Sequence, residues 1–156
     1  MTDHPFVCEL EFQRDCFLRA TACFTEENGA FAPAPGIFTV ANQMGHAAQI
    51  IDWFLEGAWS PTGFDMDFAA HERHTRAVTS VTAARAAFSA AYARAIAKIG
   101  AESFAALKTP IAPGPIMGGE PRLGIISGMC DHTAHHRGAL SIYARLLGRT
   151  PSLPYA

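Results

Sequence analysis

Two histidines four residues apart, His132 and His136, have the spacing in this sequence that points most clearly to chemistry. On a helix, side chains four apart have Cβ atoms about 5 to 6 Å from each other, so both imidazoles can bind one metal ion. Imidazole suits zinc, nickel, copper and iron. A third ligand must come from another element, and His46 is the best candidate. Three histidines leave one coordination position open, as in catalytic zinc sites.

Other polar residues near these histidines are candidates for contacting the ligands or a substrate. His135 could replace His136 as a partner of the pair, but it diverges from the apolar stripe of the predicted helix, so we expect it on the outer face or behind the ligands. Asp131 could hold an imidazole in its tautomer by accepting a hydrogen bond from its N–H, with an exposed charge as the default alternative. Arg137 either binds an anionic substrate group or lies on the surface, and Gln43 shares a helical row with His46.

The remaining histidines and the cysteines give weaker signals. His71 and His74 lie in HERH, which differs from the HExxH zinc-protease motif because its second histidine comes one residue too early. We expect both at the surface, with entry of one into the site as the alternative, and His4 in solvent. The four cysteines predict buried thiols rather than a disulfide framework. Cys130 should point away from the metal.

Four helices are expected to position these residues. Apolar stripes with a helical period predict helices from Phe6 to about Thr25, from Val40 to about Ala58 after an N-cap at Thr39, from Ser80 to Ile99, and from near Leu123 to Leu147. Residues 59–76 show no sustained period and predict a long crossover loop with at most one short helical turn. Residues 109–120, rich in Pro and Gly, predict an irregular connection or a loose hairpin.

The last predicted helix carries the central observation. Its apolar stripe consists of Ile125, Met129, His132, His136, Leu140, Tyr143 and Leu147. Two histidines therefore face the core, where each needs a polar partner to offset the loss of hydration. A single buried histidine is usually only hydrogen-bonded in place, but a pair in one stripe favours a metal site.

Composition limits the class of protein. The chain has 156 residues, a net charge of −2 and 49% hydrophobic residues, which predicts one globular domain over residues 1–156, and the four predicted helices make it all-α. A sequence pI of about 6.4 gives no basic surface for nucleic acid. The sequence has no run of eighteen apolar residues, and its start lacks the features of a secretory signal, so we expect no membrane partner and a cytoplasmic location.

Two stretches resemble a known family. DHTAHHRGALSIYARLLGRTPSLP, residues 131–154, resembles the closing helix of the DinB/YfiT-like metal-binding bundles, in which a histidine pair four apart precedes Arg-Gly and an apolar run ending in Leu-Gly and proline. FTVANQMGHAAQIIDWF, residues 38–54, is similar to that family's second helix, whose histidine matches His46. The chain departs from the pattern at Ala139, where many members carry glutamine.

The resemblance implies a four-helix bundle with a long crossover between helices two and three, commonly a homodimer, that binds zinc or nickel. Members with known activity include thiol S-transferases and thiol-dependent isomerases. We therefore expect a divalent-metal-dependent enzyme that acts on a small molecule, with a low-molecular-weight thiol as a candidate partner. Thiol transfer to a small electrophile is the leading reaction, followed by hydrolysis through a metal-bound hydroxide. The alternative is a non-catalytic, metal-stabilised dimer that serves as a binding or stress-response module.

Overall fold

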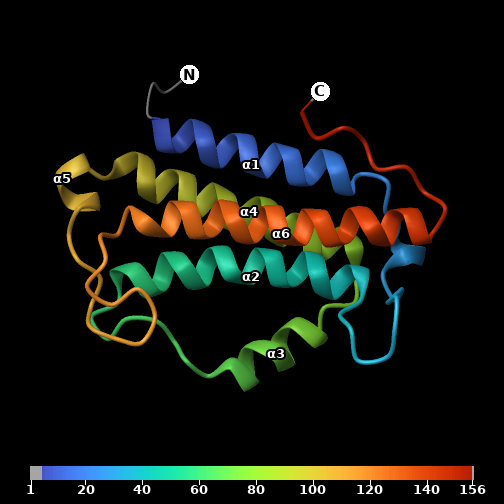
Figure 1. Ribbon diagram of the computed structural model, residues 1–156, viewed down its shortest axis with the longest axis horizontal. Coiled ribbons are helices and arrows are strands. Elements are labelled where there is room, and N and C mark those ends of the chain that lie inside the picture. Colours follow the sequence, from blue (N-terminus) through green and yellow to red (C-terminus); the bar gives the residue numbers. More distant parts are fainter. Residues whose placement is uncertain (1–4, 156) are drawn as a thin grey trace.

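Four long helices lie side by side in the structure, a computed structural model that describes residues 5–155 (Figure 1). His4, which we expect in solvent, lies outside the described residues. The helices, with the short η1 of 3-10 type, are α1 (Pro5–Thr21), η1 (Glu26–Asn28), α2 (Val40–Trp59), α3 (Phe68–Arg76), α4 (Val81–Ala101), α5 (Phe104–Leu107) and α6 (Gly124–Leu146). The all-α prediction is confirmed. Within the described chain, each helix is too short or too polar to span a lipid bilayer.

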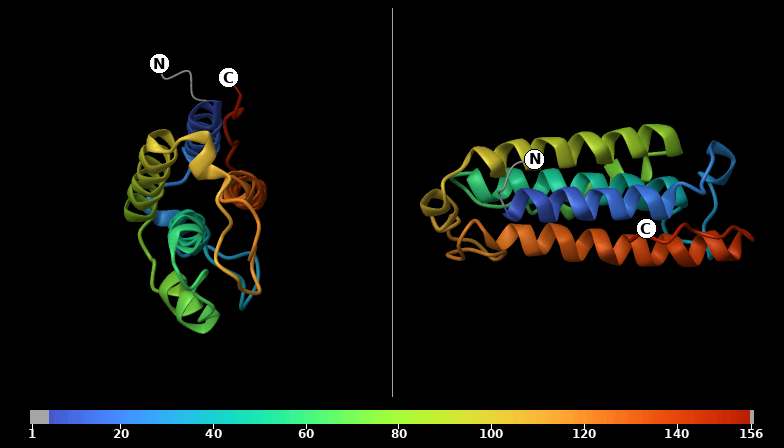
Figure 2. Two further views of the ribbon diagram at one scale, coloured as in Figure 1. Left: turned by 90° about the vertical axis from the view of Figure 1, so that its left-hand side faces the viewer. Right: turned by 90° about the horizontal axis from the view of Figure 1, so that it is seen from above.

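The four long helices form a bundle in which α1 and α2 lie diagonally opposite each other (Figure 2). Each of the two packs against both α4 and α6. Followed by colour along the chain, α1 and α6 run one way, and α2 and α4 run the other (Figure 1). Because α2 and α4 are parallel, the chain must return along the whole bundle between them. This return is the predicted long crossover, so the bundle topology is as expected.

Aromatic and aliphatic side chains fill the space between the helices. The rings of Phe17 on α1 and Phe88 on α4 stack with centroids 4.0 Å apart. Met44 on α2 and Met129 on α6 are fully buried in the same cluster. Each large side chain buried in this way contributes about 1.5 to 3 kcal/mol of transfer free energy. The core therefore holds α2 and α6 in fixed register, which the site requires.

The helix ends agree with the sequence at some positions and correct it at others. Thr39 caps α2 by accepting a hydrogen bond from the backbone N–H of Asn42, as predicted. α1 ends at Thr21, four residues earlier than expected. α4 continues through Gly100 to Ala101, two residues beyond the predicted end at Ile99. A Cβ at Gly100 would lie 3.2 Å from Cγ2 of Val7.

The crossover contains more structure than the sequence predicted. Instead of one short turn, residues 68–76 form the nine-residue helix α3, which packs along α2 outside the bundle (Figure 1). Asp67 caps it by accepting a hydrogen bond from the N–H of Ala70. Thr75 is the buried residue of this helix. Because little of α3 faces the core, its sequence shows no apolar periodicity.

Residues 109–120 form the predicted loose hairpin, closed by an isolated bridge between Pro110 and Pro121. The N–H of Ile111 donates to the carbonyl of Glu120 at 2.9 Å. The four-residue helix α5 before it was not predicted.

The cysteines form no disulfide, as predicted, but they are not all buried. Cys16 is buried, Cys23 and Cys130 are half-buried, and Cys8 is exposed, which corrects the expectation of four buried thiols. Burial raises the pKa of Cys130 to about 12. Its thiol is therefore protonated at neutral pH and unsuited to nucleophilic attack.

Candidate metal centre

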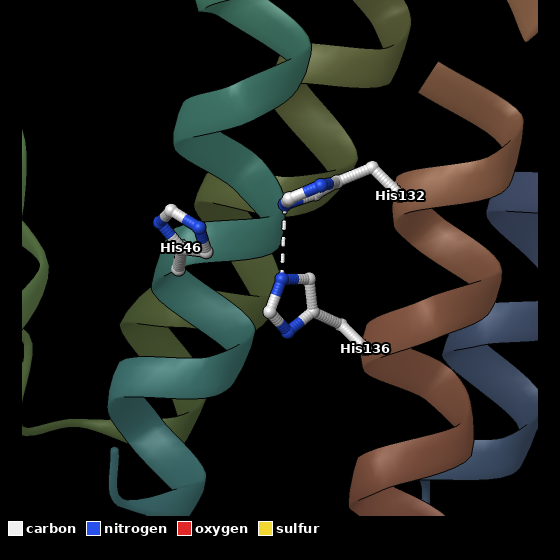
Figure 3. Close-up of side chains that lie close together, drawn as sticks. All are labelled: His46, His132 and His136. Carbon is white, nitrogen blue, oxygen red and sulfur yellow. Dashed lines mark hydrogen bonds between the residues drawn. The ribbon is translucent and has the colours of Figure 1, made fainter. Parts of the chain in front are cut away.

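The structure brings His46, His132 and His136 together between α2 and α6 (Figure 3). One nitrogen from each ring lies within 4.8 Å of the corresponding atoms of the other two. The centroid of the His46 ring is 5.2 Å from that of His132 and 5.0 Å from that of His136. The Nε2 atoms of His132 and His136 are 2.9 Å apart. These three histidines form what we call the histidine cluster.

Helix geometry explains the convergence. His132 and His136 lie one turn apart on α6, and His46 lies in the first half of the antiparallel neighbour α2. His136 is buried at 5% exposure, whereas the other two rings are half-buried. The cluster is therefore anchored in the core on one side and accessible on the other.

A directed chain of hydrogen bonds holds His136. The hydroxyl of Tyr143 donates to the carbonyl of Phe38 at 3.1 Å, so its oxygen accepts from Nε2 of Gln43 at 3.3 Å. The amide oxygen of Gln43 must then face Nδ1 of His136, with which it forms a short hydrogen bond. His136 consequently carries its proton on Nδ1 and a lone pair on Nε2.

A second chain holds His46 from the side of α3. Nε2 of Gln49 donates to the carbonyl of His71 at 3.4 Å and to Nδ1 of His71 at 3.1 Å. The amide oxygen of Gln49 accepts from the hydroxyl of Thr75 at 2.6 Å. The hydroxyl oxygen of Thr75 can then only accept from Nδ1 of His46, 3.3 Å away. His46 is thus also protonated on Nδ1, with a lone pair on Nε2.

All three rings are neutral near pH 7. Burial lowers the pKa of His132 to about 4 and that of His136 to about 3, and it also lowers the pKa of His46. Because Nε2 of His136 bears a lone pair, the hydrogen in its contact with His132 belongs to His132. In the metal-free protein, the Nε2–H of His132 therefore points at the lone pair on Nε2 of His136. A cation bound between the two rings would take the place of this hydrogen. The donor set fits a divalent transition metal.

Comparison with known proteins identifies the family. The family model of the DinB superfamily matches residues 9–140. The chain belongs to the DinB superfamily. A crystal structure of a DinB-like protein from Bacillus cereus superposes with a TM-score of 0.76, covering 94% of this chain and 93% of that chain. At 18% identity this likeness shows the fold alone. No curated protein matches the sequence.

Among the other predicted candidates in this DinB-superfamily chain, Gln43 contacts the cluster directly, as described above. His135 is exposed and outside the cluster, as expected, with its ring centroid 4.9 Å from that of His136. Asp131 is exposed, and none of the hydrogen bonds found among residues 5–155 joins it to an imidazole. The interpretation of Asp131 as an acceptor for a histidine proton is therefore unsupported.

Arg137 lies on another face of α6. Its Nη2 donates to the hydroxyl of Tyr155 at 3.4 Å, and its Cζ lies 5.5 Å from the centroid of the same ring. Arg137 is half-buried, and its Nη1 is buried without a hydrogen-bond partner among the described residues, so this contact does not decide between the two alternatives left open by the sequence.

Three further residues lie around the cluster. The sequence favours a surface position for both His71 and His74, with entry of one into the site as the alternative; His71 is half-buried and joined to Gln49 beside the cluster, whereas His74 is exposed. Thr75 was assigned no role. Gln49 could have been found, because it lies three residues after His46 on the same helix. The other two could not, since their place depends on how α3 packs on α2.

A pocket of about 260 Å³ lies between α2 and α3 and has His46 in its wall. Its apolar lining comes from Phe38, Ile50, Trp53 and Phe68. The centroid of the Phe38 ring is 5.6 Å from that of His46. The histidine cluster thus has an open space beside one of its histidines.

Proposed function

We propose that this protein is a divalent-metal-dependent enzyme that uses His46, His132 and His136 as metal ligands, with zinc or nickel as the ion. The observation that carries the proposal is the convergence of three neutral imidazoles whose ring nitrogens lie within 4.8 Å of one another. Membership in the DinB superfamily supports it. Three protein ligands leave a coordination position for a substrate or water.

The charge of the donor set favours an anionic nucleophile. Since each imidazole is neutral, the protein offers nothing in the cluster to compensate a double positive charge. When bound, a divalent ion would act as a Lewis acid that lowers the pKa of a coordinated thiol or water. A low-molecular-weight thiol reacting with a small electrophile is our leading reaction, and hydrolysis of the electrophile is the second.

The protein's own residues would fix the ligands rather than react. Gln43 holds the Nδ1 proton of His136, and Thr75 holds that of His46. Each contact keeps Nε2 directed away from the acceptor and removes the rotational freedom of the ring. Gln43 and Thr75 are both buried, Gln43 on α2 and Thr75 on α3, so each is a rigid support.

The rival interpretation is a non-catalytic protein in which the metal only fastens α2 to α6. Structural zinc sites are closed by four protein ligands, whereas the cluster offers three and the pocket adjoins His46. These features favour the enzyme.

The homodimer expected from the family resemblance stays a prediction. Ile142 and Leu146, on the C-terminal half of α6, are 61% and 59% exposed and offer an apolar surface for a second copy. Light scattering after gel filtration measures the oligomeric state.

An activity assay tests the proposal. Zinc- or nickel-loaded protein is incubated with a panel of small electrophiles, with and without a low-molecular-weight thiol such as cysteine. We expect thiol consumption that disappears after chelation and in His136→Gln but persists in His135→Gln, whose ring is exposed outside the cluster. Turnover without thiol would indicate hydrolysis. Activity that survives chelation would contradict a metal-dependent enzyme.

A further inference from the structure

The pocket beside His46 is small, and most of its lining is apolar, with His46, His71 and Glu72 as its polar residues. Three aromatic rings, from Phe38, Trp53 and Phe68, surround it together with Ile50. Its volume of about 260 Å³ lies below the roughly 300 to 1,000 Å³ of pockets that hold drug-sized molecules. The pocket is therefore large enough for one ring of a ligand.

Trp53 presents a fixed aromatic surface. Its indole N–H donates to the carbonyl of Asp65 at 2.8 Å, so the polar atom of the ring is already satisfied. Its ring centroid lies 4.5 Å from that of Phe64 and 6.4 Å from that of Phe68. These separations match aromatic packing, in which rings meet at offset or tilted angles. A further ring in the pocket would extend this arrangement.

The charges around the pocket do not favour an anion. Glu72 lies in the wall and accepts a hydrogen bond from Arg76 at 2.8 Å. Arg76 also donates to the carbonyl of Gly36 and lies over the Phe38 ring, with its Cζ 5.0 Å from the centroid. Within the described part of the chain, no lysine or arginine lines the pocket. Nε2 of His71, which also lines the pocket, lies 3.3 Å from a carboxylate oxygen of Asp65. The pocket thus offers no unpaired lysine or arginine to a carboxylate or phosphate.

His46 belongs to both the pocket and the histidine cluster. Its ring centroid lies 5.6 Å from that of Phe38 and 5.0 Å from that of His136. A ring seated against Phe38 can therefore carry a substituent that reaches the cluster. This relationship connects the apolar space to the place where chemistry is proposed.

From these contacts we infer that the pocket binds a small uncharged aromatic compound. Its assignment as the electrophilic substrate rests on the proposed enzymatic function, whereas binding itself requires no metal, because the walls come from α2, α3 and the residue Phe38. The substrate class is thus a single-ring electrophile whose reactive carbon is a substituent of the ring.

Tryptophan fluorescence provides the test. The chain has two tryptophans, so Trp59→Phe leaves Trp53 in the pocket wall as the sole emitter. The probe is para-nitrobenzyl alcohol, whose nitroarene quenches excited tryptophan on contact by accepting an electron, and the protein is kept metal-free with a chelator. Benzyl alcohol and its saturated counterpart cyclohexylmethanol serve as competitors of nearly the same size.

Two exposed phenylalanines provide matched variants in the same background. Phe68, in the pocket wall, is 54% exposed, and Phe104, on α5, is 56% exposed, so neither Phe68→Ala nor Phe104→Ala empties the core. We expect saturable quenching that benzyl alcohol reverses and cyclohexylmethanol does not. Phe68→Ala should weaken binding about two- to tenfold, the loss of one aromatic pair. Phe104→Ala should bind like the parent.

The absence of saturable quenching, or equal affinity in Phe68→Ala and the parent, would overturn the pocket assignment. Equal competition by cyclohexylmethanol would overturn the aromatic specificity. If the probe binds but the protein takes up no metal, the pocket stands and the proposed enzyme falls. Metal uptake without probe binding would reject only the pocket.

Discussion

The amide oxygen of Gln43 on α2 accepts a hydrogen bond from Nδ1 of His136 on α6. The contact crosses the interface between the two helices that supply the histidine cluster. Because Tyr143 and the carbonyl of Phe38 fix the direction of the Gln43 amide, the same chain fixes which nitrogen of His136 is free.

Replacing Gln43 with leucine should weaken metal binding about 10- to 100-fold, the usual effect of removing the partner of a metal-bound histidine. Leucine has a similar size but cannot accept the Nδ1 proton of His136. The measurement is the zinc affinity by competition with a chromogenic chelator. Gln43→Glu keeps an acceptor and should retain most of the affinity. Wild-type affinity in Gln43→Leu would show that the contact does not position the ring.

Replacing Thr75 with valine should weaken zinc binding about tenfold, because the hydroxyl between His46 and Gln49 is lost. Thr75→Ser keeps the hydroxyl and is the control for the change of shape. The same competition titration compares the three proteins. If valine and serine behave alike, α3 does not support His46.

Acid should destabilise the metal-free protein in a defined range. In the unfolded chain these histidines titrate near 6.5, whereas in the folded protein the pKa of His132 is about 4 and that of His136 about 3. Between these values the unfolded state binds more protons, so the free energy of unfolding falls as the pH decreases from 6.5 toward 4. Carboxylates whose pKa is lowered in the folded protein, such as Glu26, change the free energy of unfolding only below about pH 4.5.

The urea midpoint measured at several pH values checks this prediction. His132→Gln should flatten the curve over that range, because glutamine does not titrate. A midpoint independent of pH between these limits, or one that rises on acidification, would contradict neutral buried imidazoles.

Replacing Gly57 with alanine should lower the free energy of unfolding by about 1 to 3 kcal/mol through overpacking. A Cβ at Gly57 would lie 2.2 Å from Cδ1 of the buried Phe64. Gly138 is also helical, and a Cβ added there would meet no other atom within 4 Å, so Gly138→Ala should raise stability by up to about 1 kcal/mol. Chemical denaturation measures both. Equal effects would mean that α2 and the following loop do not pack closely.

The sequence predicts the bundle and the histidine cluster because both depend on local regularity. The period of α6 places His132 and His136 on its core face, and the row along α2 places Gln43 and His46 beside that face. Antiparallel packing of two such helices is enough to bring the rings together.

The environment of the cluster depends on contacts that no local pattern encodes. Thr75 reaches His46 across 29 positions of sequence, through a helix that buries little of its own surface. His71 and the pocket depend on the same helix. Arg137 meets Tyr155 only because the C-terminal segment folds back along α6. Such positions require the tertiary structure.

Zinc titration of the purified protein by calorimetry, with elemental analysis of the dialysed product, tests the metal centre most directly. We expect a single ion per chain in the wild type and in His135→Ala, and loss of stoichiometric uptake in His46→Ala, His132→Ala and His136→Ala. Full uptake by the His46 variant, or loss of the ion in His135→Ala but not in His136→Ala, would contradict the assignment.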